Sequence, residues 1–263
     1  MLKILSVESI LNLPKNLLLD TKITKKVILE STDLNATEKR LILDDVQRLT
    51  WIATLKPTNS NLNEYVDNLV SYKEVNFIKV QLKEQKNYLK IAQLLQKVIP
   101  YHLVLWLEDE SSFCVHTAFK RINQADNTKR TIQEIIYSPW IETNRLDKIT
   151  ETFLESLDFN TLLHHSLKAY YENFVAQIFA LESAKITGFF RQQEFSKTFD
   201  EVPLLREIES LEQQIKALKA TLKKQTQIKK KIELNMQIKR LHFKFSELQE
   251  TLIKNNPNPK GLL

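Results

Sequence analysis

One short stretch of this sequence suggests metal-dependent chemistry. Gln81, Lys83 and Glu84 stand at the end of Lys73–Glu84, where apolar and polar residues alternate as they do in a strand. Nucleases of the restriction type carry an acid–x–lysine at such a strand end and a second acid on the neighbouring strand. Here Gln81 replaces the first acid, and the preceding strand, expected at Leu49–Leu55, contains neither Asp nor Glu. Mg²⁺ is usually held by one or two carboxylates together with water and phosphate, so the stretch predicts either a degenerate nuclease edge, with Lys83 and Glu84 beside it, or an ordinary strand surface.

Histidine and cysteine predict no metal centre. His164 and His165 are adjacent and point to different sides of a helix, and neither a CxxC nor an HxxxH spacing occurs. The other histidines are isolated: His102, His116 and His242. The single cysteine, Cys114, lies among apolar residues of an expected strand, which indicates a buried and unreactive thiol.

Glycine is scarce, and this excludes common nucleotide-binding loops. Only Gly188 and Gly261 occur in the 263 residues, whereas phosphate-binding loops need glycine where the backbone approaches the ligand. Neither a Walker-type loop nor a dinucleotide fingerprint can be written. We therefore expect no cofactor, no metal and no catalytic residue, and we favour a non-enzymatic role while leaving an enzymatic one open.

The C-terminal part carries two apolar seams whose residues are spaced by four and three, as in a coiled coil. The first seam is Leu204, Ile208, Leu211, Ile215, Leu218 and Leu222, and the second is Leu234, Ile238, Leu241, Phe245, Leu248 and Leu252. The step of twelve residues between them breaks the repeat. This favours two helices in an antiparallel hairpin over residues 202–254, with the bend within Lys223–Lys231. One long helix with a phase break is the alternative.

The net charge of +6 is located in the same segment. Of 38 Lys/Arg and 32 Asp/Glu, twelve and six lie between Val202 and Lys254, which leaves 26 of each sign elsewhere. No acid lies between Lys219 and Lys231, and the lysines of this stretch are Lys219, Lys223, Lys224, Lys229, Lys230 and Lys231. A hairpin would gather them at its tip, where they would contact nucleic acid phosphate or an acidic protein surface. The alternative is a solvated helix end that keeps the chain soluble.

The preceding residues predict an α+β domain, a small mixed β-sheet with packed helices mainly on one side. The expected strands are 49–55, 73–84, 101–107, 112–122 and 131–137, and the expected helices begin at Ala36, which Asn35 caps, and cover 87–98 and 157–183. We expect residues 1–187 to form this domain, 188–201 a joint, 202–254 the coiled-coil hairpin and 255–263 a flexible tail. A lone cysteine, no signal peptide and no long apolar span indicate a cytoplasmic protein without membrane contact.

Several short motifs, taken in order, resemble a bacterial domain-of-unknown-function family, numbered four-three-nine-one. They are Leu13-Pro14-Lys15, Thr21-Lys22, Lys25-Lys26, Leu49 to Trp51, Ile99-Pro100-Tyr101, Ala118-Phe119-Lys120-Arg121, Ser138-x-Trp140, Val202-Pro203-Leu204 and Lys231 to Leu241. The resemblance covers nearly the whole chain. It implies a small companion of DNA helicases and adenine methyltransferases in restriction or antiphage gene clusters, and it offers no catalytic residues.

Three residues match the pattern of that family and have expected roles. Asn235 would set the alignment of the two helices, because a polar residue in an apolar seam fixes register. Lys120 and Arg121 would either hold phosphate or pair with Glu108–Glu110 across a hairpin.

Three functions remain as hypotheses. The first is a non-enzymatic accessory subunit of a restriction-modification or antiphage complex, which binds a helicase, methyltransferase or nuclease subunit and also the DNA backbone. The second is a degenerate metal-dependent nuclease subunit. The third is a homodimeric structural protein whose helical segment pairs with itself.

Overall fold

The computed structural model describes residues 6–30, 34–126, 128–162, 165–192, 195 and 201–256. It divides into two compact units, Met1–Ile178 and Phe179–Leu263. The boundary lies inside one helix, whereas the sequence suggested a domain end after residue 187. Half of the expected joint and all but two residues of the expected tail lie outside the described residues.

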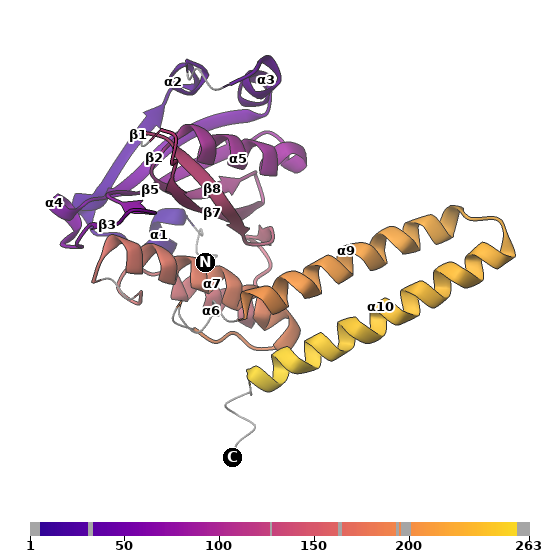
Figure 1. Cartoon of the computed structure of the whole chain (residues 1–263). Coiled ribbons are helices and arrows are strands. Elements are labelled where there is room, and N and C mark those ends of the chain that lie inside the picture. The colour runs from indigo at the N-terminus through magenta and orange to yellow at the C-terminus, as the bar shows by residue number, and fades with distance from the viewer. Residues whose placement is uncertain are drawn as a thin grey trace. The chain divides into compact units, whose positions relative to one another are not determined.

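The first unit is built on a seven-stranded mixed sheet (Figure 1). Its strands are β1 (Leu18–Ile23), β2 (Val46–Leu55), β5 (Val75–Leu82), β6 (His102–Glu108), β7 (Ser112–Ile122), β8 (Arg130–Tyr137) and β9 (Ile141–Glu142). The order is β1-β2-β5-β6-β7-β8, with β9 beside β7. Among the described strands of this sheet, only β5 and β6 pair in parallel, and a helix connects them, as parallel neighbours require. The expected mixed sheet is therefore confirmed.

One face of the sheet packs against three helices, α2 (Lys25–Leu29), α3 (Ala36–Asp44) and α5 (Tyr88–Val98). Ile78 and Val80 of β5 belong to the same buried cluster as Ile42 of α3 and Ile91 of α5. Asn35 caps α3 as expected: its side chain accepts the backbone N–H of Glu38, and the Glu38 side chain accepts the backbone N–H of Asn35. The cap and the apolar face together explain why this short helix begins where it does.

The opposite face of the sheet is also covered, which corrects the expectation of helices mainly on one side. Phe77 of β5 contacts the rings of Tyr170 and Phe174 in α7 (Leu167–Thr187). Lys79, two residues along, forms an ion pair with Glu8 of α1 (Val7–Leu11). Because side chains alternate between faces along a strand, β5 binds one layer of helices with Ile78 and Val80 and another with Phe77 and Lys79.

Shorter elements complete the first unit. They are η1 (Lys15–Leu17), α4 (Pro57–Ser60), the pair β3 (Tyr65–Val66) and β4 (Ser71–Tyr72), η2 (Gln85–Asn87) and α6 (Lys148–Ser156). The expected helix at 157–183 is wrong in its first part, since α6 ends at Ser156 and α7 begins at Leu167.

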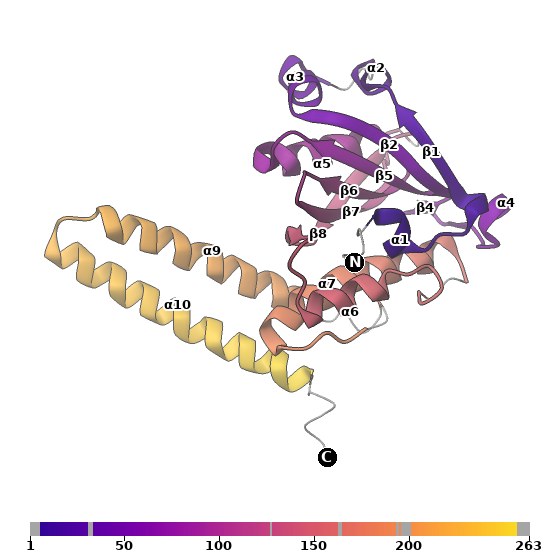
Figure 2. The same cartoon turned by 180° about the vertical axis from the view of Figure 1, so that it is seen from behind.

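The second unit contains the expected helical hairpin, formed by α9 (Val202–Lys224) and α10 (Ile228–Asn255). The two helices run side by side in Figures 1 and 2. Seam residues Ile208, Leu211, Ile215, Ile238 and Leu252 are buried, as the spacing predicts. Polar contacts also join the helices: Lys244 Nζ lies 2.6 Å from Glu207 Oε1, and Asn256 donates to Glu201 at 2.8 Å.

The bend of the hairpin lies at Gln225–Gln227, within the expected range and without glycine or proline. The Gln225 side-chain oxygen accepts the backbone N–H groups of Thr226 and Gln227, at 2.9 and 3.0 Å. The Gln225 N–H closes the last turn of α9 on Thr221 and Leu222. A glutamine side chain therefore supplies the hydrogen bonds that stabilise this connection.

Candidate functional site

A cluster of lysines surrounds the tip of the hairpin. Lys223 and Lys224 form the last turn of α9, and Lys229, Lys230 and Lys231 lie in the first turn of α10. These five side chains and Lys219 are exposed. Within the described residues, no ion pair joins any of the six to an acid. The structure thus brings together all six lysines that the sequence singled out in this segment.

The helix ends add to the positive potential at this tip. Backbone N–H groups at a helix N-terminus are unpaired and carry partial positive charge, so anions stabilise that end and cations destabilise it. The first turn of α10 contains no acid and three lysines. Such a helix start is electrostatically unfavourable until an anion binds, and a phosphate group would find both ammonium and backbone N–H donors there.

Lys120 lies elsewhere and faces inward. Its Nζ donates to the carbonyl oxygens of Ile99 at 2.8 Å and Tyr101 at 2.6 Å, and only 1% of the residue is exposed. Burial lowers the pKa of this amine well below its usual range, and the charge of Arg130 lowers it further. Both expectations for Lys120, a phosphate contact and an ion pair with the hairpin acids, are therefore wrong. Arg121, the next residue, is exposed.

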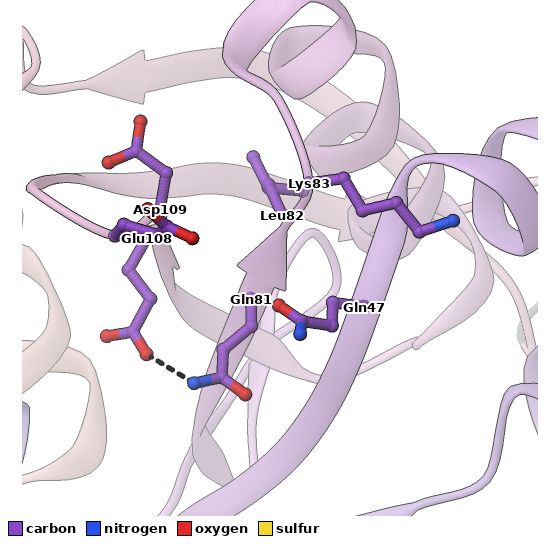
Figure 3. Close-up of a pocket in the computed structure, with 7 residues that line it drawn as sticks. Gln47, Gln81, Leu82, Lys83, Glu108 and Asp109 are labelled. Atoms are coloured by element: carbon purple, nitrogen blue, oxygen red, sulfur yellow. Dashed lines mark hydrogen bonds between the residues drawn. The ribbon is translucent and has the colours of Figure 1, made fainter.

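A second candidate site is a shallow pocket of about 390 Å³ at the ends of the parallel strands β5 and β6 (Figure 3). It is lined by Gln47, Gln81, Leu82, Lys83, Glu108, Asp109 and Glu110. Gln81 Nε2 donates to Glu108 Oε1 at 3.1 Å. Burial raises the pKa of the Glu108 carboxyl, while the charge of Lys79 and the Gln81 hydrogen bond oppose that change.

The pocket does not assemble the expected nuclease constellation. In Figure 3, the Lys83 side chain points away from Glu108 and Asp109. Its charge instead acts on Lys25, whose pKa is lowered first by burial and then by Lys83. Glu84 is exposed and does not line the pocket, and β2 contributes Gln47 rather than an acid. No group of three potential metal ligands occurs in the described part of the chain.

Two of the isolated histidines and the cysteine are core residues, whereas His242 is exposed. His102 and His116 are buried, and burial lowers the pKa of each to about 3. Cys114 is buried, and burial raises the pKa of its thiol far above the usual range, which agrees with an unreactive thiol. Of the adjacent pair His164 and His165, His164 lies outside the described residues.

Two features of α10 differ from what the sequence predicted. Asn235 is exposed and does not lie in the seam, so the expected role in helix register is wrong. A second group of apolar residues on α10 was not singled out from the sequence, although spacings of four and seven mark it. These are Ile228, Ile232, Met236 and Phe243, and all four are exposed.

Comparison with protein families matches residues 11–244 of the chain to a domain of unknown function, DUF4391. No curated protein and no solved structure matches the chain. None of the helices that the structure describes has the length and apolar character needed to span a bilayer.

Proposed function

Since the chain belongs to the DUF4391 family, a domain of unknown function, we propose its role from the geometry of its sites and from the setting that the sequence resemblance implies. It is a non-enzymatic accessory subunit of a bacterial restriction-modification or antiphage complex. The sheet domain docks on a helicase, methyltransferase or nuclease subunit, and the tip of the hairpin contacts the DNA backbone.

The observation that carries this proposal is the exposed lysine cluster at the tip. Lysines from two helix ends and the N–H groups at the start of α10 face solvent within one short stretch of chain. Ammonium and backbone N–H donors bind phosphate oxygen without regard to base sequence. The contact would therefore give affinity for DNA, and the partner subunit would supply sequence recognition and catalysis.

The strand-end pocket supports this non-enzymatic role over a nuclease role. A metal-dependent nuclease needs its lysine beside the metal-binding carboxylates, and here Lys83 points away from Glu108 (Figure 3). The Glu108 carboxylate accepts a hydrogen bond from Gln81, the residue that stands where the motif requires an acid.

The test compares the binding of purified protein to labelled duplex DNA with that of two charge-matched variants. The tip variant replaces Lys223, Lys224, Lys229, Lys230 and Lys231 by Gln. The control variant replaces five exposed lysines of the sheet unit by Gln: Lys15, Lys22, Lys73, Lys86 and Lys90. Both variants lose five positive charges, so they differ only in where the charge is removed.

We expect the tip variant to lose affinity by about 10²-fold or more at low salt, because each lost phosphate contact also removes released counterions. The control variant should bind within a few-fold of the unmodified protein. Equal losses in both variants would show that only net charge matters. No binding by the unmodified protein would show that the lysines keep the helix end solvated or contact an acidic protein surface.

A further inference from the structure

Helix α10 carries a second apolar stripe that is separate from its seam with α9. The stripe consists of Ile228, Ile232, Met236 and Phe243, which are 76%, 56%, 54% and 68% exposed. Large apolar side chains are common singly on protein surfaces, but four in register on one helix are a different case.

The geometry of the helix places this stripe opposite the seam. At 3.6 residues per turn, the four stripe residues fall within an arc of about 80°. Seam residues such as Leu234, Ile238 and Leu241 are centred roughly 160° away on the same helix. Since α9 covers the seam, the stripe faces away from α9. A helix with apolar residues on two opposite faces has one face more than a two-helix hairpin can bury.

The charges that lie beside the stripe between Ile228 and Phe243 are positive. Lys229, Lys239 and Arg240 lie within about 75° of its centre, and all three are exposed. Between Ile228 and Phe243, Glu233 is the acid of α10, and it lies roughly 95° from the centre. The next acid, Glu247, lies one turn beyond Phe243 and about 55° from the centre. An incoming helix would therefore meet apolar side chains bordered by positive charge, and acidic residues at its own flanking positions would pair with them.

We infer that the stripe is the docking surface for an amphipathic α-helix of a partner protein, whose apolar face is bordered by Asp or Glu. Binding converts the hairpin into a three-helix coiled coil. This inference rests on the proposed accessory function, because it adds a contact on the hairpin to the docking of the sheet domain on the protein partner. Apart from Ile228 and Lys229 at the start of the helix, it uses residues of the middle of α10, whereas the proposed DNA contact uses the tip.

A second copy of the chain fits this surface less well. Pairing two α10 helices in antiparallel orientation with Met236 against Phe243 places Lys239 against Arg240 at the centre of the contact. In a parallel pairing, Lys239 and Arg240 of one copy would each lie beside the same residue of the other copy. Both arrangements bring like charges together, which destabilises a helix pair, whereas an acid-flanked helix satisfies the same cations.

The test uses two synthetic helical peptides that share one leucine seam and differ only in their flanking residues, Glu in one and Lys in the other. Binding of each labelled peptide to the full chain is followed by fluorescence anisotropy. The first variant replaces Ile232, Met236 and Phe243 by Ser, and the second is Lys239→Glu with Arg240→Glu. Circular dichroism confirms that each variant retains the helix content of the unmodified protein, as expected for exposed positions.

We expect the Glu-flanked peptide to bind, the serine variant to lose affinity by about tenfold or more, and the charge-reversed variant to prefer the Lys-flanked peptide. The inference is overturned if neither peptide binds, or if flanking charge has no effect. It is also overturned if sedimentation shows a dimer of the unmodified protein that the serine variant abolishes, since a second copy would then cover the stripe. Duplex DNA binding by the serine variant should be unchanged, so this inference and the DNA contact can fail separately.

Discussion

Lys120 shows that a basic side chain near a strand end can be buried and can donate hydrogen bonds within the core. Its amine satisfies two carbonyl oxygens that follow the C-terminal end of α5, where helix carbonyls lack partners within the helix. The pairing of β7 with β8 shifts register between Phe119 and Lys120. The shift places the extra residue, Gln133, in β8, so Lys120 stays on the same face of β7 as the buried Ala118. The burial of Lys120 follows from the fold, and its basic residue type gives no sign of that burial in the sequence.

His116 is a second buried residue whose charge matters for stability. The residue is fully buried on β7, and in the described part of the chain neither ring nitrogen has a hydrogen-bond partner. Burial lowers its pKa to about 3, and the charge of Lys120 acts in the same direction. The folded state therefore holds this imidazole neutral at pH values where the unfolded chain, with an ordinary pKa near 6.5, takes up a proton.

We predict that acid destabilises the protein in part through His116. Stability is fully present above about pH 6.5 and is lost as the pH falls towards 3, by up to about 1.4 kcal/mol per pH unit for each such histidine. In His116→Leu, the free energy of unfolding measured with urea should fall less between neutral pH and about pH 4 than in the unmodified protein. The exposed His242 provides the control, since His242→Leu should keep the original pH dependence. Identical slopes in all three proteins would contradict the assignment.

The elements that could be predicted from the sequence are those whose burial leaves a repeating pattern. Strands β5 to β8 and the two hairpin helices follow that pattern and were found with small errors at their ends. Strand β1 was missed because its residues are exposed except for the half-buried Ile23, so no alternation marks it. Helix α6 was missed, and α7 was expected to begin at Leu157 rather than at Leu167, because Leu157 and Leu162 are apolar and buried without being helical.

The same distinction between buried and exposed apolar residues predicts different mutational effects on the two sides of α10. Ile238 is 8% exposed in the seam, so Ile238→Ala should lower the stability of the hairpin by about 2 kcal/mol. Ile232→Ala removes a side chain of the same size from the stripe and should change stability by no more than about 0.5 kcal/mol. Thermal unfolding followed by far-ultraviolet circular dichroism measures both. Equal destabilisation would mean that the stripe is already buried within the chain.

At the scale of the whole molecule, the family match extends beyond the sheet unit. It covers residues 11–244, which include all of α9, the lysines of the tip and the stripe residues of α10. The hairpin is thus part of the domain that defines the family. A function for the family has to account for the hairpin as well as for the sheet, and the proposed accessory role does so by assigning the tip to a DNA contact and the stripe to a protein partner.

The salt dependence of duplex binding tests the DNA contact most directly. Each phosphate that a lysine neutralises contributes about −0.9 to the slope of log K against log salt, so contacts by five lysines predict a slope of about −4 to −5. The slope should fall close to zero in the variant that replaces Lys223, Lys224, Lys229, Lys230 and Lys231 by Gln. A slope that stays the same in this variant, or a slope near zero in the unmodified protein, would contradict a phosphate contact at the hairpin tip.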